Sequence, residues 1–269
     1  MSSHSSLMPV VYIPHGGGPM PLLGDANHAQ LSQFLRQLGQ QLPTPKAIVI
    51  FSAHWEENLV TINSAKTPGM YFDYYGFPPA SYQFNYPAVG SASLTEQLAT
   101  LLSAKGISWQ MNSQRGFDHG VFVPLMLMYP EASIPVVQVS LLKSLDPAQH
   151  IALGQAISAL REQQVLILGS GMSFHNMQAF FSGSPEVVRQ SGEFDQWLNK
   201  SLTNPELSAE QRFARLSEWQ HAPFGRYSHP REEHLLPLMV CLGAAQGRQA
   251  TNNFQAELLN SRISGFIWH

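Results

Sequence analysis

The chain has 269 residues, of which 44% are hydrophobic and 12% charged, and a formal net charge of −3. This composition predicts a well-buried globular protein rather than a disordered one, and the length suits one large α/β domain. No cluster of lysine or arginine residues is present, so nucleic acid is not an expected partner.

The compartment is indicated by the cysteine content and by the N-terminal segment. Cys241 is the only cysteine, so no intramolecular disulfide can form, which fits a reducing cytoplasm. The first eight residues, MSSHSSLM, are polar, lack the apolar stretch of a signal peptide and contain His4, which we expect to be solvated. No apolar run approaches the ~20 residues that span a bilayer, so a membrane is not an expected partner. The sequence leaves the oligomeric state open.

Three apolar runs end in small or polar residues and then a histidine. They cover residues 9–13, 47–51 and 165–168, and they lead to His15, His54 and His175. Such runs indicate strands buried on both faces, as in parallel sheets. Ligands of open α/β sheets bind outside the carboxyl ends of the strands, so we predict that these histidines share one site.

The remaining elements complete an α/β pattern. Helices are predicted at residues 27–42, 93–104, 146–163, 185–202, 205–219 and 235–242, and further strands at 60–63, 108–112, 135–142, 254–259 and 263–268. Asp146 and Pro147 suit the start of one helix, and Pro124 suits the first turn of another. We expect a single α/β domain over residues 1–269, with a central, mostly parallel or mixed sheet and helices on both faces.

Residues 67–90 form a long segment rich in proline, glycine and aromatic residues, without helical or strand periodicity. A structured loop of this length is usually functional or a lid. Its aromatic residues could line a pocket for an aromatic substrate, or they could pack on one another as a small satellite core. The candidates are Tyr71, Phe72, Tyr74, Tyr75 and Phe77, and we expect Tyr75 and Phe77 to contact substrate.

The chain contains 11 histidines, which differ in their sequence surroundings. His28, His150 and His221 lie in or beside helical stretches without a motif and are expected at the surface or as caps, while His229, before Pro230, is expected to be structural. The other candidates stand at strand ends, glycine turns or a helix start; they are His15, His54, His119, His175 and His234.

This set predicts a mononuclear, histidine-rich metal site with spare histidines for proton transfer. Imidazole is a good ligand for Zn, Fe, Cu and Ni. The sequence has no HExxH, CxxC or GxSxG motif, which disfavours a thermolysin-like zinc site, thiolate zinc and an esterase nucleophile.

Several motifs resemble those of class III extradiol ring-cleaving dioxygenases, and most of all the 4,5-DOPA extradiol dioxygenase branch. They are Pro14-His15-Gly16, Ser52-Ala53-His54-Trp55, Gly116-Phe117-Asp118-His119-Gly120, His175-Asn176, Glu233-His234-Leu235-Leu236-Pro237-Leu238 and the aromatic segment Gly76-Phe77-Pro78 with Tyr82 and Tyr86-Pro87-Ala88. The resemblance extends from about Pro9 to Leu242.

The resemblance implies cleavage of a small catechol, such as DOPA, beside its two hydroxyls, with molecular oxygen and a non-haem ferrous ion. It implies that His15, His54 and His234 bind the metal. His175 would be the acid/base, or a fourth ligand without substrate, and His119 would position or protonate oxygen or substrate. A metal cation lowers the pKa of the oxygens it binds, and histidine accepts and returns protons near neutral pH.

Two departures from the family's pattern bear on the site. The loop after the first strand reads HGGGP rather than HGSP, and the extra glycine could reshape the opening near His15. The best-known members bind iron with two histidines and a glutamate, whereas here Glu233 stands next to His234. Adjacent side chains on a helix point ~100° apart, so only one is expected to face the metal, and we choose His234.

Some alternatives stay open at this stage. Three neutral ligands also suit zinc, so Zn(II) could be the bound metal and the protein a zinc-dependent hydrolase. A non-enzymatic metal-binding protein on the same fold is a further reading. Asp118 could orient His119 or cap the following helix. Arg115, Arg226 and Arg231 are equal candidates for binding a substrate carboxylate.

Overall fold

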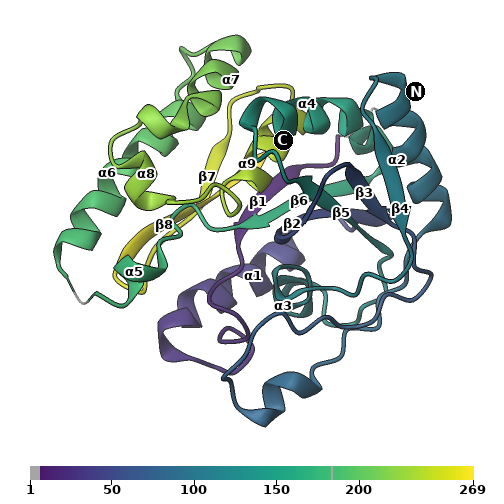
Figure 1. Cartoon of the computed structure of the whole chain (residues 1–269), viewed down its shortest axis with the longest axis horizontal. Helices are drawn as coiled ribbons and strands as arrows, with labels where there is room; N and C mark the ends of the chain where they lie inside the picture. The colour runs from purple at the N-terminus through teal and green to yellow at the C-terminus, as the bar shows by residue number, and fades with distance from the viewer. Residues whose placement is uncertain (1–6, 183) are drawn as a thin grey trace.

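One mixed sheet organises the protein, and the computed structural model describes residues 7–182 and 184–269 of it. Within these residues eight strands are ordered β4-β3-β5-β2-β6-β1-β8-β7 (Figure 1). The central strands β1 (Val10–Pro14), β6 (Val165–Gly171), β2 (Ala47–Glu57) and β5 (Val136–Leu142) are mutually parallel. His4, expected to be solvated, lies outside the described residues.

The outer strands make the sheet mixed. On one side β3 (Val60–Asn63) runs antiparallel to β5, and β4 (Trp109–Asn112) runs parallel to β3. On the other side β7 (Thr251–Leu258) and β8 (Ser261–Trp268) form an antiparallel hairpin that joins β1 through β8. The predicted α/β class and the closing hairpin are confirmed.

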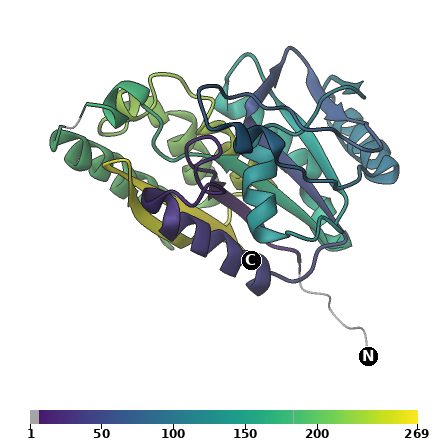
Figure 2. The same ribbon diagram turned by 90° about the horizontal axis from the view of Figure 1, so that it is seen from below.

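Helices cover both faces of the sheet because the buried strands alternate between two cores. In β1, Val10 and Tyr12 belong to one core, and Val11 and Ile13 to the other. The first core is covered by α2 (Ala92–Ala104), α4 (Pro147–Ile157), α6 (Glu186–Thr203), α7 (Ala209–Ser217) and α9 (Leu236–Ala244). The second is covered by α1 (Ala29–Gln41) and α3 (His119–Met128), which lie in front of the sheet in Figure 2.

Short helices fill the connections between these elements. They are α5 (Met177–Phe180), α8 (Gly225–Ser228) and the 3-10 helices Ala26–His28, Pro79–Gln83, Ser158–Gln163 and Trp219–His221. In the described part of the chain, no helix combines the length and the apolar character that crossing a membrane requires.

Two predicted boundaries are wrong, and both matter for the site. β2 does not end at Phe51; after a shift in its register with β5 it continues to Glu57, so His54 lies within the strand. α3 begins at His119, which places Pro124 inside the helix rather than in its first turn. The start of α4 is as predicted: the Asp146 side chain accepts hydrogen bonds from the first backbone N–H groups.

Helices α4 and α9 pack closely because each carries a glycine at the crossing. A Cβ atom on Gly154 would lie 2.0 Å from the Val240 carbonyl oxygen, and one on Gly243 would lie 2.0 Å from the Ile151 carbonyl oxygen. Any larger residue would push the helices apart. This packing holds α9, and with it the preceding His234, against the sheet.

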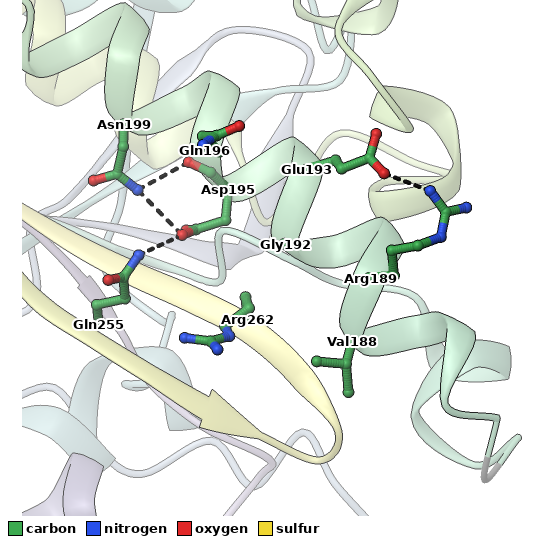
Figure 3. A pocket seen from close by; sticks show the side chains of 9 residues that line it. All are labelled: Val188, Arg189, Gly192, Glu193, Asp195, Gln196, Asn199, Gln255 and Arg262. Carbon is green, nitrogen blue, oxygen red and sulfur yellow. Dashed lines mark hydrogen bonds and ion pairs between the residues drawn. The ribbon is translucent and has the colours of Figure 1, made fainter.

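A buried carboxylate ties α6 to the hairpin. Asp195 accepts hydrogen bonds from Gln255 Nε2 at 2.7 Å and Asn199 Nδ2 at 3.2 Å, beside an open surface cavity of about 610 Å³ (Figure 3). It also accepts one from Ser264 Oγ at 2.6 Å. Burial raises the pKa of Asp195, although these hydrogen bonds oppose the shift. The network links α6 to both strands of the hairpin, because Gln255 lies in β7 and Ser264 in β8.

Candidate active site

The histidines singled out in the sequence meet in one cavity of about 420 Å³. They come from different elements: His15 follows β1, His54 lies in β2, His175 follows β6, His119 begins α3 and His234 precedes α9. Ring centroids are 4.9 Å apart for His15 and His54, 3.9 Å for His54 and His119, and 3.4 Å for the stacked pair His175 and His234. The predicted convergence at the carboxyl edge of the parallel strands is confirmed.

The tautomer of His15 is set by a serine that sequence reasoning missed. Ser170 donates its hydroxyl proton to the Gly120 carbonyl oxygen, which is free because Pro124 has no N–H with which to bond it within α3. Ser170 Oγ must therefore accept from His15 Nδ1, which lies 3.0 Å away. The Nε2 atom of His15 is left with its lone pair.

The nitrogen geometry fits a metal ion. His15 Nε2 and His54 Nε2 lie 3.1 Å apart. Two imidazole nitrogens at ~2.0–2.1 Å from one ion would be separated by a similar distance. Ligand atoms of His15, His54 and His119 all lie within 4.8 Å of one another, and the ring of His234 is 5.2 Å from that of His15. The donor set is neutral imidazole, which suits a transition metal.

Asp73, in the loop of residues 67–90, orients His54 and His119. Its Oδ1 lies 2.8 Å from His119 Nδ1 and also accepts the His119 backbone N–H, and its Oδ2 lies 3.5 Å from His54 Nδ1. A carboxylate at Nδ1 fixes the ring and leaves Nε2 available. Sequence reasoning missed Asp73, although it is the only charged residue between Lys66 and Glu96.

Asp118 neither orients His119 nor caps α3 with its side chain, so both expectations for it are wrong. It is fully buried behind His54, where it accepts hydrogen bonds from Ser52 Oγ and Gln138 Nε2, both at 2.6 Å, and pairs with Arg115 at 3.1 Å. The backbone of α3 points its carboxylate away from the neighbouring imidazole. Its role is to hold β2 in place beneath the site.

Glu233 orients His175 and His234, as Asp73 orients His54 and His119. Its Oε1 lies 2.9 Å from His234 Nδ1 and 3.3 Å from His175 Nδ1. We expected Glu233 and His234 to lie on a helix. This expectation is wrong, because both residues precede α9. Hydrogen-bond distances to Nδ1 mark Glu233 as the partner that orients both rings. Its outer oxygen pairs with Arg231 at 3.2 Å.

The electrostatics favour the neutral form of three imidazoles, those of His15, His54 and His234. Burial, reinforced by the neighbouring rings, lowers the pKa values of His15 and His54 well below the usual value. Burial, with the nearby His175 ring, lowers the pKa of His234 to about 3, against the opposing effect of Glu233. For Glu233 itself, burial acts to raise the pKa, but hydrogen bonds from His175 and His234 outweigh it and hold the pKa far below its ordinary value. Neutral rings with free lone pairs are what a cation requires.

The backbone of His234 is held firmly by the sheet. Its carbonyl oxygen accepts hydrogen bonds from Tyr12 Oη at 3.0 Å and from the Met172 backbone N–H at 3.1 Å. A Cβ atom on Gly171 would lie 2.1 Å from the same oxygen, so this approach requires glycine. The sequence Gly169-Ser170-Gly171 therefore serves His15 and His234 together.

Two of the remaining histidines, His28 and His150, are buried, although we expected surface or capping positions. His28 is buried, lines the cavity and accepts the Gly17 N–H at Nε2, so the surface assignment is wrong; it stands at the N-cap position of α1, but its side chain makes no capping hydrogen bond. His150 is also buried, with Nδ1 at 2.7 Å from the Asp146 carbonyl oxygen. His221 is exposed, as expected, and His229 is structural, as expected, with Nε2 at 3.0 Å from the Ser173 carbonyl oxygen.

The aromatic residues of the loop at 67–90 do both things that the sequence allowed: some line the cavity, and others pack on one another. Tyr74 and Phe77 line the cavity, whereas Phe72 packs in an aromatic cluster with Tyr74 and Phe122. Tyr75 is 92% exposed and lies outside the cavity lining, so the structure does not support its predicted substrate contact. The chain turns at Gly76, where φ is +79°, and Tyr75 points to solvent just before this turn.

Comparisons with known proteins agree with this site. The family described as the catalytic LigB subunit of aromatic ring-opening dioxygenase matches residues 1–267. A 4,5-DOPA dioxygenase extradiol from Beta vulgaris is 36% identical over 99% of this chain and 96% of its own length, and one from Escherichia coli (strain K12) is 34% identical over 91% and 88%.

Two further relatives complete the comparison. The dioxygenase tasH of Hapsidospora irregularis is 36% identical over 99% of this chain and 87% of its own length. A crystal structure of an uncharacterized protein from Escherichia coli K12 superposes with a TM-score of 0.79 and 30% identity, covering 97% of this chain and all of that one. The chain thus belongs to the LigB family of aromatic ring-opening dioxygenases and is an enzyme of the extradiol class.

Proposed function

We propose that this enzyme opens the ring of a catechol beside its two hydroxyls, using molecular oxygen and one ferrous ion held by His15, His54 and His234. The observation that carries the proposal is the cluster of neutral imidazoles whose Nδ1 atoms face oxygen partners and whose rings line one apolar cavity. The family assignment supports ring opening over hydrolysis.

The metal, when bound, would supply Lewis acidity to the catechol oxygens and a route for electrons to dioxygen. His15 and His54 suit this role because their Nε2 atoms already lie at a ligand-to-ligand distance. His234 is preferred as the third ligand because its backbone is fixed by Tyr12 and Met172. Zn(II) is a second metal that the same nitrogens would accept.

His175 is the proposed base for the catechol proton. Its ring lines the cavity and is partly exposed, and its Nδ1 faces the Glu233 carboxylate at 3.3 Å. A proton accepted at Nε2 creates an imidazolium that the carboxylate stabilises, so the proton can later be returned to the opening ring. Its stacking on His234 places this base beside the proposed metal ligand.

His119 is the proposed second proton-handling group. It is held by Asp73 through both its Nδ1 and its backbone N–H, and its ring lies against His54. Nε2 can thus accept a proton and return it to substrate or oxygen without moving the ring. Phe77 supplies an apolar surface to the same cavity.

The test is reconstitution without air. Protein freed of metal would be loaded with ferrous iron under argon, mixed with a catechol and exposed to air, and ring opening followed as a new yellow absorbance. Zinc-loaded protein and His175→Ala are parallel samples. The proposal requires colour only with iron, oxygen and His175; colour from zinc-loaded protein would contradict it.

The names of the plant and bacterial relatives make DOPA one catechol to include. A cytoplasmic location is part of the same proposal, supported by the single, buried and free Cys241. Fractionation of cells that make the protein at native levels would test it; recovery in a membrane or secreted fraction would contradict it.

A further inference from the structure

We infer that the catechol accepted by this site carries an uncharged, apolar substituent. This rests on the proposed function and specifies its substrate class. In the described part of the chain, no aspartate, glutamate, lysine or arginine lines the histidine cavity. Apart from imidazoles and the Gly16–Gly18 backbone, the walls are mostly apolar side chains such as Met20, Phe77, Met172 and Phe180.

The arginines that could have bound a substrate carboxylate have other partners. Arg115 donates to the His54 carbonyl oxygen at 2.9 Å and to Asp118 at 3.1 Å. Arg226 pairs with Glu232 at 2.6 Å, and Arg231 pairs with Glu56 at 2.6 Å. None of the three lines the cavity.

A carboxylate held among these apolar walls would therefore lose water without gaining a lysine or arginine partner. The carboxylates that contact the imidazoles at Nδ1, Asp73 and Glu233, are negative. Repulsion from these groups adds to the desolvation cost. An apolar substituent avoids both the desolvation cost and the repulsion.

The cavity mouth points to the same chemistry. Met177 and Phe181 line the cavity, yet their side chains are 53% and 77% exposed. Large apolar side chains at a rim gain free energy when an apolar group covers them. The cavity volume of about 420 Å³ lies in the range for ligands larger than a single ring, so a substituent has room to reach this rim.

The test compares one catechol in two charge states: dihydrocaffeate and its methyl ester. With iron-loaded protein, kcat/KM for the ester should exceed that for the acid by about tenfold or more. Equal values, or a preference for the acid, would overturn the inference while leaving ring opening intact.

A binding measurement separates this inference from the proposed function. Calorimetry with zinc-loaded protein under argon should give a Kd for the ester about tenfold lower than for the acid. If neither compound is opened by iron-loaded protein but the ester still binds more tightly, the proposed function fails and the apolar preference stands. Equal binding would overturn the preference.

A charge added at the mouth provides the converse test. Met177→Arg should reduce the ester-to-acid ratio of kcat/KM by about fivefold or more, because a cation would then face the substituent. Met111→Arg is the matched control, since Met111 is 45% exposed on β4 and lies outside the cavity lining. An unchanged ratio in Met177→Arg, or an equal change in Met111→Arg, would contradict the proposed position of the substituent.

Discussion

His15 Nε2 and His54 Nε2 face each other at 3.1 Å, while Ser170 and Asp73 face the opposite nitrogen of each ring. Two lone pairs at this distance repel unless a proton or a cation lies between them. Burial lowers the pKa values of both rings and so disfavours an imidazolium. A neutral His54 with its proton on Nε2 would satisfy this contact in the metal-free protein, whereas a proton on Nδ1, toward Asp73, leaves both Nε2 lone pairs free for a metal ion, which relieves the repulsion.

Metal content should distinguish the ligands from the proton-handling histidines. His54→Ala and His234→Ala should lower iron affinity by more than the ~10–100-fold that outer partners of ligands typically control. His119→Ala should retain iron but lose turnover by about 100-fold, the lower end for a missing acid/base. Elemental analysis after dialysis against chelator, together with initial rates, would check this. A full equivalent of iron in His234→Ala, with none in His119→Ala, would transfer the third-ligand role to His119.

Asp73→Asn should lower kcat by about 10–100-fold while the fold persists. The amide can present its NH₂ group to His119 Nδ1, which removes the charge and favours the wrong tautomer. Asp195→Asn is the control, because it also changes a hydrogen-bonded aspartate, but one in α6 that does not line the histidine cavity. Steady-state rates and circular dichroism would be measured for both. Equal activity losses would show that Asp73 acts through stability alone.

Two helical glycines should respond oppositely to alanine. Gly243→Ala should destabilise by about 1–3 kcal/mol, because its Cβ would meet the Ile151 carbonyl oxygen at 2.0 Å. Gly192→Ala should stabilise by up to about 1 kcal/mol, because the nearest atom, Arg262 Cγ, is 3.7 Å away and alanine favours helix. Thermal unfolding would follow both, at ~2–4 °C per kcal/mol for a domain of somewhat smaller size. Destabilisation by both variants would refute the close-packing explanation.

Acid should destabilise the metal-free protein, partly through His229. Burial lowers the pKa of this imidazole to about 3, opposed by its bond to the Ser173 carbonyl. Above about pH 6.5, His229 is neutral in both states and its contribution is complete; as pH falls toward 3, only the unfolded chain takes up the proton. The free energy of unfolding should therefore fall by up to about 1.4 kcal/mol per pH unit from this residue.

Urea unfolding in chelator between pH 7.5 and 5 would test this, with His229→Gln as the comparison. The variant retains a hydrogen-bond donor but has no group that titrates, so its slope against pH should be shallower. Identical slopes for the two proteins would remove His229 from the explanation. His15, His54, His150 and His234, whose pKa values burial also lowers, remain in both proteins and contribute to the residual slope.

Much of the site follows from local patterns in the sequence. Apolar runs before His15, His54 and His175 indicate parallel strands, and parallel strands deliver their carboxyl ends to one edge. His119 and His234 were recognisable by their glycine and acidic neighbours. These features depend on residues close in sequence, which is why they could be predicted.

The partners of the histidines could not be predicted in the same way. Asp73 and His119 are 46 residues apart, and Ser170 and His15 are 155 apart, so only the folded chain pairs them. Tyr74 and Tyr75 are equivalent as types, but an aperiodic loop carries no signal for which one faces the cavity. Asp118 was misassigned because adjacency to His119 does not determine where its side chain points.

The most direct test of the central claim is oxygen uptake during turnover. An oxygen electrode and the yellow absorbance would be read together for iron-loaded wild type, zinc-loaded wild type and iron-loaded His54→Ala. We predict one dioxygen consumed for each ring opened, without hydrogen peroxide, in the first sample only. Ring opening by zinc-loaded protein or by His54→Ala, or oxygen uptake that yields peroxide and no opened ring, would contradict an iron-dependent extradiol site at these histidines.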